Sequence, residues 1–215
     1  MDKVASSSSR GRPKDVGKRA DIFEAASALF RARGFYGTSM DALAQEAKVS
    51  KATLYSHFED KASLYRALIA DKMAVYQVDD FSERCGGDLQ QDLTMIAQQM
   101  LSLIFDEESL DMLRMVIAEA REGSDVPDLF EEVGPRRLLQ QISDYLQQQK
   151  DGGVAFISDP PTDTNLFASL VIDHRTMMFT LMGVQAPPDM ATRKRHARNA
   201  VARFLLLKKS ELAQG

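Results

Sequence analysis

The side chains best suited to chemistry follow Ser50, where basic, hydroxyl-bearing and aromatic residues recur at helical spacing. Leu54 and Phe58 are four positions apart, so they share the inward face of a short helix. A helix with such an outer face suits the major groove of DNA, because lysine and hydroxyl groups reach base edges and phosphates. The outer face carries Lys51, Thr53, Tyr55, Ser56 and His57.

Two elements must position this face. A preceding short helix is expected to be capped by Thr38, with Asp41 three residues on in a capping-box pattern, and to bury an apolar stripe within residues 40–47. A turn at residues 48–49 follows, and Ser50 is a good N-cap for the second helix. The pattern predicts a helix-turn-helix with the second helix as the recognition helix.

These residues resemble the DNA-binding signature of the tetracycline-repressor (TetR) family. The matching positions are Gly34, Phe35, Thr38, Ser39, Met40, Leu43, Ala44, Ala47, Val49, Ser50, Thr53, Leu54, Tyr55, Phe58, Lys61 and Leu64. Ala52 departs from the glycine that many members have, and alanine favours helix there.

The resemblance implies how DNA is bound. Thr38, Ser39 and Lys61 would hold the register on phosphates, and Tyr55 also matches a phosphate-contact position. The recognition helix, including Ala52, would read base edges. Two copies of the chain would bind the two half-sites of a pseudo-palindromic operator.

Residues 1–17 are expected to form a disordered basic arm around Arg12. Arginine-rich N-terminal arms reach the minor groove of DNA, and a solvated tail is the other interpretation. Both remain open at this stage.

Composition restricts the class of protein. The chain has 215 residues, of which 44% are hydrophobic and 27% charged, and a single cysteine, Cys85. One cysteine permits no internal disulfide, and neither a signal peptide nor an apolar run of about 20 residues is visible, so we expect a cytoplasmic protein with no membrane partner. The net charge is −4, yet residues 1–61 hold 11 Lys and Arg against 8 Asp and Glu, which places the basic surface at the helix-turn-helix.

The rest of the chain shows helical periodicity and no sustained alternation. We predict an all-α fold of roughly nine helices, with a helix-turn-helix domain at residues 18–64 and a larger effector-binding and dimerisation domain at residues 65–215. A kink or short break is expected at Gly134-Pro135. The helix that contains Arg114 and the segment 130–137 resemble the C-terminal domain of the AefR-like branch of the TetR family.

Methionines are frequent in the larger domain, and methionine packs adaptively against varied apolar partners. The resemblance implies a pocket for an apolar effector, and a plain hydrophobic core is the alternative for the same side chains. His174, beside an apolar stripe, is either a satisfied core histidine or a ligand contact. The expected pocket residues are Met100, Phe105, Met112, Met115, Phe167, His174 and Met178.

The last two long segments, 164–182 and 189–212, carry apolar residues on more than one side. A second partner is needed to cover such faces, so we expect an isologous homodimer interface. Its expected residues are Val171, Leu181, Ala197, Val201, Phe204 and Leu205.

The sequence therefore favours a homodimeric DNA-binding transcriptional regulator, with repression as the favoured sign and a small molecule as the effector. The rival interpretation is an all-α enzyme or carrier without a DNA role. No nucleophile elbow, P-loop or zinc-protease motif is present, and neither a cofactor nor a metal site is expected. A gel-shift with genomic DNA would distinguish the two interpretations.

Overall fold

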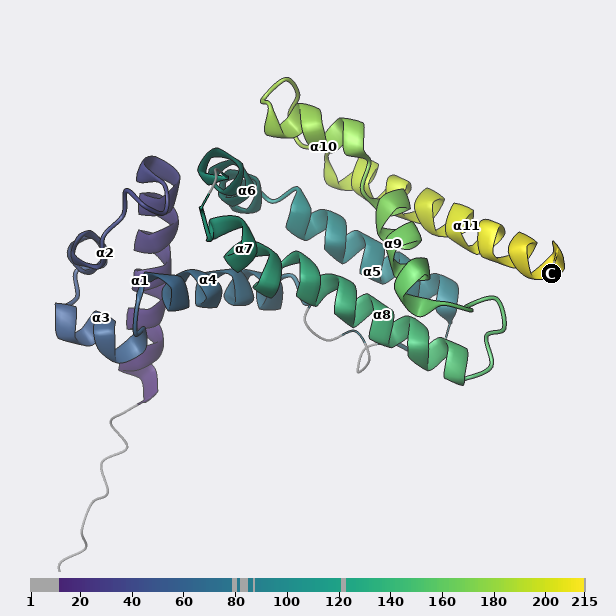
Figure 1. Cartoon of the computed structure of the whole chain (residues 1–215), viewed down its shortest axis with the longest axis horizontal. Helices are drawn as coiled ribbons and strands as arrows, with labels where there is room; N and C mark the ends of the chain where they lie inside the picture. The colour runs from purple at the N-terminus through teal and green to yellow at the C-terminus, as the bar shows by residue number, and fades with distance from the viewer. Residues whose placement is uncertain (1–11, 79–80, 82–84, 87, 121–122, 215) are drawn as a thin grey trace, which may run out of the picture. The chain divides into compact units, whose positions relative to one another are not determined.

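The computed structural model of the chain describes residues 12–78, 81, 85–86, 88–120 and 123–214 (Figure 1). Over these residues the structure is all-helical and contains no strand, which confirms the predicted fold class. The helices are α1 (Arg12–Arg33), α2 (Met40–Glu46), α3 (Lys51–His57), α4 (Lys61–Val75), α5 (Leu89–Ile104), α6 (Glu107–Glu119), α7 (Val126–Val133), α8 (Pro135–Asp151), α9 (Pro160–Val171), α10 (His174–Leu181) and α11 (Met190–Gln214).

The break expected at Gly134-Pro135 is present, and the segment 164–182, which the sequence suggested as one helix, is also divided. Gly134 and Pro135 separate α7 from α8, where a Cβ on Gly134 would lie 2.9 Å from the carbonyl oxygen of Phe130. The second division separates α9 from α10, where Asp173 caps α10 and its Oδ1 accepts hydrogen bonds from the backbone N–H of Arg175 (3.1 Å) and Thr176 (3.3 Å). A capping aspartate takes a non-helical backbone, so it begins a new helix within the apolar pattern.

The chain forms two compact units, residues 1–68 and 69–215. The division falls inside α4, whose residues through Leu68 belong to the first unit and whose residues from Ile69 belong to the second.

The apolar residues Val75, Val78 and Phe81 continue a helical spacing past the end of α4, but the helix ends at Val75. Gln77 takes the left-handed conformation (φ 54°), and the N–H of Val78 donates to the carbonyl of Met73 at 3.1 Å. A hydrogen bond of this six-to-one kind terminates helices. The left-handed position is usually a glycine, but here Gln77 occupies it, so no glycine marks the end of the helix in the sequence.

The N-terminal boundary also differs from the prediction. The arm was expected to be disordered through residue 17, but α1 begins at Arg12. Pro13 falls in the first helical turn, where its missing N–H costs no hydrogen bond and its fixed φ suits a helix. Residues 1–11 of the expected arm lie outside the described residues.

The core of the second unit lies between α5, α8, α9 and α11. α11 packs along α5 and α9, and α8 packs against α9 (Figure 1). Phe167 of α9 and Phe204 of α11 meet edge-to-face with ring centroids 5.5 Å apart. A buried ion pair joins the same two helices, with Lys208 Nζ 2.8 Å from Asp163 Oδ1.

Over the described residues, no helix combines the length and the apolar character that a membrane crossing requires.

Candidate DNA-binding surface and effector cavity

Two serine caps fix the helix-turn-helix. The Oγ of Ser39 accepts the N–H of Ala42 at 3.2 Å, and the Oγ of Ser50 accepts the N–H of Thr53 at 3.0 Å. Between them Lys48 takes φ 54°, which turns the chain sharply from α2 into α3. The cap of α2 is therefore Ser39, one residue later than the expected Thr38.

Thr38 serves the fold instead. Its side chain is 1% exposed, and its Oγ1 donates to the carbonyl oxygens of Gly34 (2.8 Å) and Leu29 (3.3 Å). These carbonyls belong to the end of α1, where helical partners run out. The predicted contact between Thr38 and DNA is not possible from this buried position.

The exposed face of α3 carries the side chains that the sequence assigned to it. Lys51 reaches back to α2, with its Nζ 2.6 Å from Asp41 Oδ2 in a solvent-exposed ion pair. Tyr55 is exposed, and the Oγ1 of Thr53 lies 2.8 Å from the Oγ of Ser50. Ala52 and Ser56 are exposed and His57 is half-buried. The surface thus presents one ammonium, several hydroxyls, an imidazole and a phenol on one short helix.

Lys61 is engaged within the first unit. Its Nζ donates to the carbonyl oxygens of Phe35 (2.6 Å) and Thr38 (2.8 Å) and lies 4.4 Å from the centroid of the Phe35 ring. These contacts join the start of α4 to the loop between α1 and α2. The sequence predicted a phosphate contact for this lysine, and the structure shows its ammonium holding the loop that precedes the helix-turn-helix.

Arg12 is the first residue of α1, and its side chain lies outside the described residues. The structure therefore leaves its expected contact with the minor groove as a prediction.

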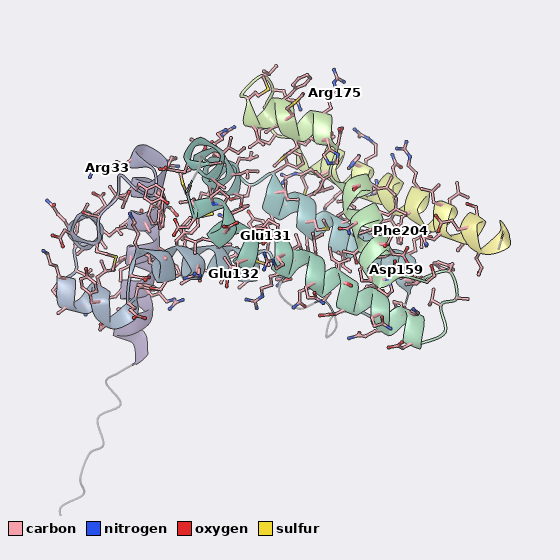
Figure 2. The ribbon with its side chains drawn as sticks, in the orientation of Figure 1. Arg33, Glu131, Glu132, Asp159, Arg175 and Phe204 are labelled. Carbon is pink, nitrogen blue, oxygen red and sulfur yellow. The ribbon has the colours of Figure 1, made fainter. Side chains whose placement is uncertain are left out.

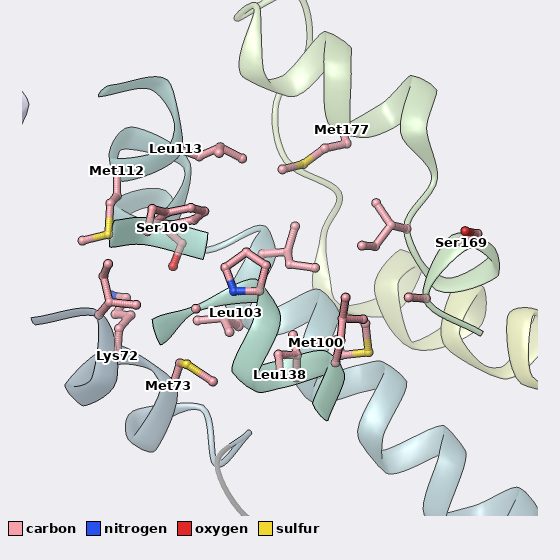
Figure 3. Close-up of a pocket in the computed structure, with 18 of the residues that line it drawn as sticks. Lys72, Met73, Met100, Leu103, Ser109, Met112, Leu113, Leu138, Ser169 and Met177 are labelled. Atoms are coloured by element: carbon pink, nitrogen blue, oxygen red, sulfur yellow. The ribbon is translucent and has the colours of Figure 1, made fainter. Parts of the chain in front are cut away.

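A mostly apolar cavity of about 380 Å³ lies within the second unit (Figure 3). A volume of this size is within the range of small-molecule sites. Helices α4 to α10 all contribute to its wall. The lining residues are Ile69, Lys72, Met73, Met100, Leu103, Ile104, Ser109, Met112, Leu113, Phe130, Gly134, Pro135, Leu138, Leu139, Asn165, Ala168, Ser169, Ile172, His174 and Met177.

Three of the expected pocket residues, Met100, Met112 and His174, line this cavity. Met178 does not, because it is 51% exposed while its neighbour Met177 faces the cavity. Successive side chains on a helix point in directions about 100° apart. Of two adjacent residues, one can therefore line the cavity while the other faces solvent.

The other three expected residues lie elsewhere in the unit. Phe167 packs against Phe204 in the core, and Met115 is buried away from the cavity wall. Phe105 lines a separate cavity of about 300 Å³, near Arg193 and His196.

A charged network lies at one end of the main cavity, where Figure 3 shows Lys72 and Ser109 together. Lys72 Nζ is 2.7 Å from Asp106 Oδ2 and 2.6 Å from Glu108 Oε2, and the hydroxyl of Tyr76 donates to Asp106 Oδ1 at 2.7 Å. Burial alone would lower the pKa of Lys72, but its hydrogen bonds to both carboxylates outweigh burial and raise that pKa. Burial likewise opposes ionisation of Asp106, yet hydrogen bonds from Lys72 and Tyr76 hold its pKa below the ordinary value. Both groups therefore remain charged.

Sequence reasoning missed Lys72, Met73 and Met177 as cavity residues. A signal was present for the first two, because their helix directly follows the helix-turn-helix and leads from it into the rest of the chain. No pattern in the sequence distinguished Met177 from Met178.

Arg114 holds α10 beside the cavity. Its Nε donates to the carbonyl of Leu181 at 3.0 Å, its Nη2 donates to the carbonyl of Thr180 at 2.9 Å, and its Nη1 pairs with Asp111 at 2.8 Å. These carbonyls lie at the end of α10, where helical partners are missing.

The expected dimer residues are mostly part of the protomer's own core. Val171, Ala197, Val201, Phe204 and Leu205 are buried within the single chain, and Leu181 is half-buried. Figure 2 shows Phe204 among the helices of the second unit. The sequence analysis correctly identified these helices as apolar. It was wrong to assign these side chains to a dimer interface, because they face the core of their own chain. The exposed apolar residues of this region are Met178, Met182, Val184, Met190, Leu206, Leu207 and Leu212.

Over the described residues, no group of three His, Cys, Asp or Glu side chains is placed to hold a metal ion.

Comparisons with known proteins agree with this architecture. Residues 22–68 match the sequence model of "Bacterial regulatory proteins, tetR family", and residues 91–207 match "AefR-like transcriptional repressor, C-terminal domain". The chain is 26% identical over 153 residues to YvkB, an HTH-type transcriptional regulator of Bacillus subtilis (strain 168), with 71% of this chain and 78% of that protein covered.

Solved structures share the fold. The flavonoid-responsive regulator FrrA is 27% identical, with a TM-score of 0.66 over 88% of this chain and 96% of that chain. A TetR-family regulator from Mesorhizobium loti is 23% identical, with a TM-score of 0.72 over 91% of this chain and 98% of that chain.

One family model alone covers more than half of the chain, and a second covers the helix-turn-helix. The matching families and relatives are regulators, which sets aside the enzyme interpretation. The chain therefore belongs to the tetR family and is a helix-turn-helix DNA-binding transcriptional regulator.

Proposed function

We propose that this protein is a cytoplasmic, homodimeric repressor that leaves a pseudo-palindromic operator when a small, largely apolar compound occupies the cavity of the second unit. The observation that carries the proposal is the cavity itself, whose wall is apolar apart from a few polar groups at its ends. Such a wall is typical of a small-molecule site. The name of FrrA as flavonoid-responsive supports an apolar organic effector as the class to test.

At the DNA, the exposed face of α3 reads base edges in the major groove. Lys51, Thr53 and Tyr55 extend from this face, with Ala52, Ser56 and His57 beside them. Ser39, at the start of α2, places the positive end of that helix near a phosphate. The first unit is thus the DNA-binding domain and the second is the effector and dimerisation domain.

The homodimer uses the exposed apolar side of α10 and α11. Leu206 is 70% exposed, and Met182 and Leu212 are also exposed. Large apolar side chains left exposed along the last two helical segments indicate a surface that a partner covers. A twofold pairing of this side would present two recognition helices to two half-sites.

The cavity can influence DNA binding through α4. Ile69, Lys72 and Met73 of this helix line the cavity, and Lys61 at its start holds the loop before the helix-turn-helix. A ligand that favours one position of α4 changes the fraction of the protein in the DNA-competent state. It must bind the DNA-competent and DNA-incompetent states with different affinity, because equal affinity shifts nothing.

The test compares Met177→Trp, which fills the cavity, with Met178→Trp, which adds the same group to the exposed neighbour. Operators are first selected from a random DNA pool, and release is followed by fluorescence anisotropy across a panel of apolar compounds. We expect Met177→Trp to keep operator binding and lose release, while Met178→Trp retains both. An active compound that releases DNA equally from wild type and Met177→Trp would refute the assignment of the cavity.

A further inference from the structure

The charged groups of the main cavity restrict the ligand it accepts. Among the described residues that line it, only Lys72 and His174 can carry a charge. His174 is exposed, whereas the side chain of Lys72 is 20% exposed. Recognition of a buried polar group in the cavity therefore depends on Lys72.

The positive charge of Lys72 is exceeded by the negative charge of its two partners. Its ammonium contacts the carboxylates of both Asp106 (2.7 Å) and Glu108 (2.6 Å), so the three side chains together carry one net negative charge. An anionic ligand at this end would meet that negative charge and lose its own hydration. A carboxylate is therefore disfavoured, even though a lysine lines the wall.

A cationic ligand is also disfavoured, because it would have to displace Lys72 to reach the carboxylates. The two carboxylates also lie outside the set of residues that line the cavity. The polar side chains of the cavity wall at this end are those of Lys72 and Ser109.

The same ammonium suits a neutral oxygen. An ammonium has three N–H donors, and two of those of Lys72 are directed to Asp106 and Glu108. Ser109, also on the cavity wall, has its Oγ 3.4 Å from the same Asp106 Oδ2 that Lys72 contacts. Lys72 and Ser109 are therefore neighbours: the Lys72 ammonium can donate to a ligand oxygen, and Ser109 Oγ, whose proton is directed at Asp106, can accept from a ligand hydroxyl.

The remainder of the wall supports one orientation of the ligand. Methionine, leucine and isoleucine side chains follow this polar end, and Ser169 lies at the opposite end (Figure 3). Ser169 and Asn165 are exposed, so polar groups there are already in contact with water. Among the described residues of the wall, those that can bond a buried ligand oxygen therefore lie at the Lys72 end.

We propose that the effector is an uncharged, largely apolar molecule with a carbonyl or hydroxyl oxygen at one end, and that Lys72 donates to this oxygen while Ser109 accepts from it where it is a hydroxyl. The inference rests on the proposed function, in which this cavity is the effector site. Lys72 then selects ligands by charge, because its paired carboxylates repel anions while its remaining N–H donates to a neutral oxygen.

The experiment uses three probes of equal chain length: 2-undecanone, undecanoate and undecylamine. Each displaces the uncharged dye N-phenyl-1-naphthylamine from the purified full chain, and operator release is measured in parallel. We expect 2-undecanone to displace the dye at about tenfold lower concentration than either charged probe. Undecanoate or undecylamine binding as tightly as the ketone would overturn the inference.

Two variants should change probe binding in opposite directions. Lys72→Met removes the donor, and the ketone should bind about five- to tenfold more weakly. Glu108→Gln removes one negative charge and leaves the Asp106 cap of α6 in place, so undecanoate should gain about three- to tenfold. Lys150→Met is the matched control, because Lys150 is exposed and donates to the carbonyl of Ser158 away from the cavity. Loss of the preference in His174→Gln but not in Lys72→Met would assign selection to the imidazole and overturn the inference.

The parallel readouts separate the two levels of the argument. Selective dye displacement by the ketone without operator release supports recognition by Lys72 and refutes the proposed effector role. Operator release by undecanoate in preference to the ketone supports the effector role and overturns the inference. If neither the dye nor any probe binds, the cavity is not a ligand site and both are overturned.

Discussion

Replacing Lys61 by alanine should destabilise the protein without changing how strongly salt weakens DNA binding. The substitution removes two charge-assisted hydrogen bonds, to the carbonyls of Phe35 (2.6 Å) and Thr38 (2.8 Å), and an ammonium 4.4 Å from an aromatic ring. Phe35 and Thr38 are both buried, so their carbonyls lose partners that water replaces poorly.

The magnitude follows from these contacts. A buried acceptor left without a partner costs about 1–3 kcal/mol, and a cation over a ring contributes about 0.5–2 kcal/mol. Partial hydration of the two carbonyls reduces the sum, so we expect Lys61→Ala to lower the free energy of unfolding by about 2–4 kcal/mol. Lys51→Ala is the matched control, since its ion pair with Asp41 is solvent-exposed and such pairs contribute about 0–1 kcal/mol.

The salt dependence of DNA binding should rank the two variants in the reverse order, with the larger change in Lys51→Ala. Each phosphate that a lysine neutralises adds about 0.9 to the slope of log affinity against log salt concentration. Lys51 can exchange Asp41 for a phosphate, so Lys51→Ala should lower the slope by about one unit, whereas Lys61→Ala should leave it nearly unchanged. Urea unfolding and salt titrations on a selected operator measure both effects. A slope lowered by about one unit in Lys61→Ala, with stability intact, would show that its ammonium contacts phosphate and that the internal role inferred here is wrong.

Four further outcomes are expected. Thr53→Ala should alter preference at one or two base pairs of each half-site, and selection from a randomised operator library should reveal the change. Leu206→Glu places a charge on the exposed apolar side of α11 and should yield folded monomers; light scattering that still shows a dimer would exclude that interface. Lys208 is 5% exposed, so Lys208→Met should cost about 3–5 kcal/mol in urea unfolding by leaving Asp163 buried without its partner, and an additional Asp163→Leu should recover much of the loss. The pKa of Asp106 is lowered in the folded protein, so its carboxylate stabilises the fold at pH values above the ordinary pKa of 3.8. This contribution is lost as the pH falls through the folded-state pKa. Asp106→Asn should therefore lose stability less steeply than wild type in an acid titration below pH 3.8.

The sequence by itself determined the fold class and the helix-turn-helix. Ser50, Leu54 and Phe58 interact within a few residues of one another, so capping and periodicity were sufficient to place α3 and its exposed face. The family was also recognisable, because many residue types recur at fixed spacing in one short stretch. Local chemistry acts over a turn or two of helix, and that is the range over which a single sequence is informative.

Even within that stretch, the roles of two residues depend on hydrogen-bond partners elsewhere in the chain. Thr38 and Lys61 carry groups that suit DNA, yet one donates to the end of α1 and the other to the loop that follows it. A hydroxyl or an ammonium has the same appearance in a sequence whether its acceptor is a phosphate or a carbonyl of the same chain.

The tertiary structure alone decided the cavity and the inward side of the last helices. Met177 and Met178 are adjacent and identical in type, but only the packing of α10 against α6, held by Arg114, directs the first to the cavity. Val201 and Leu206 are likewise both apolar on α11, and contact with α5 and α9 buries the first and leaves the second exposed. Periodicity fixes which residues share a helical face, but which face meets the core is set by contacts between helices that are far apart in the chain.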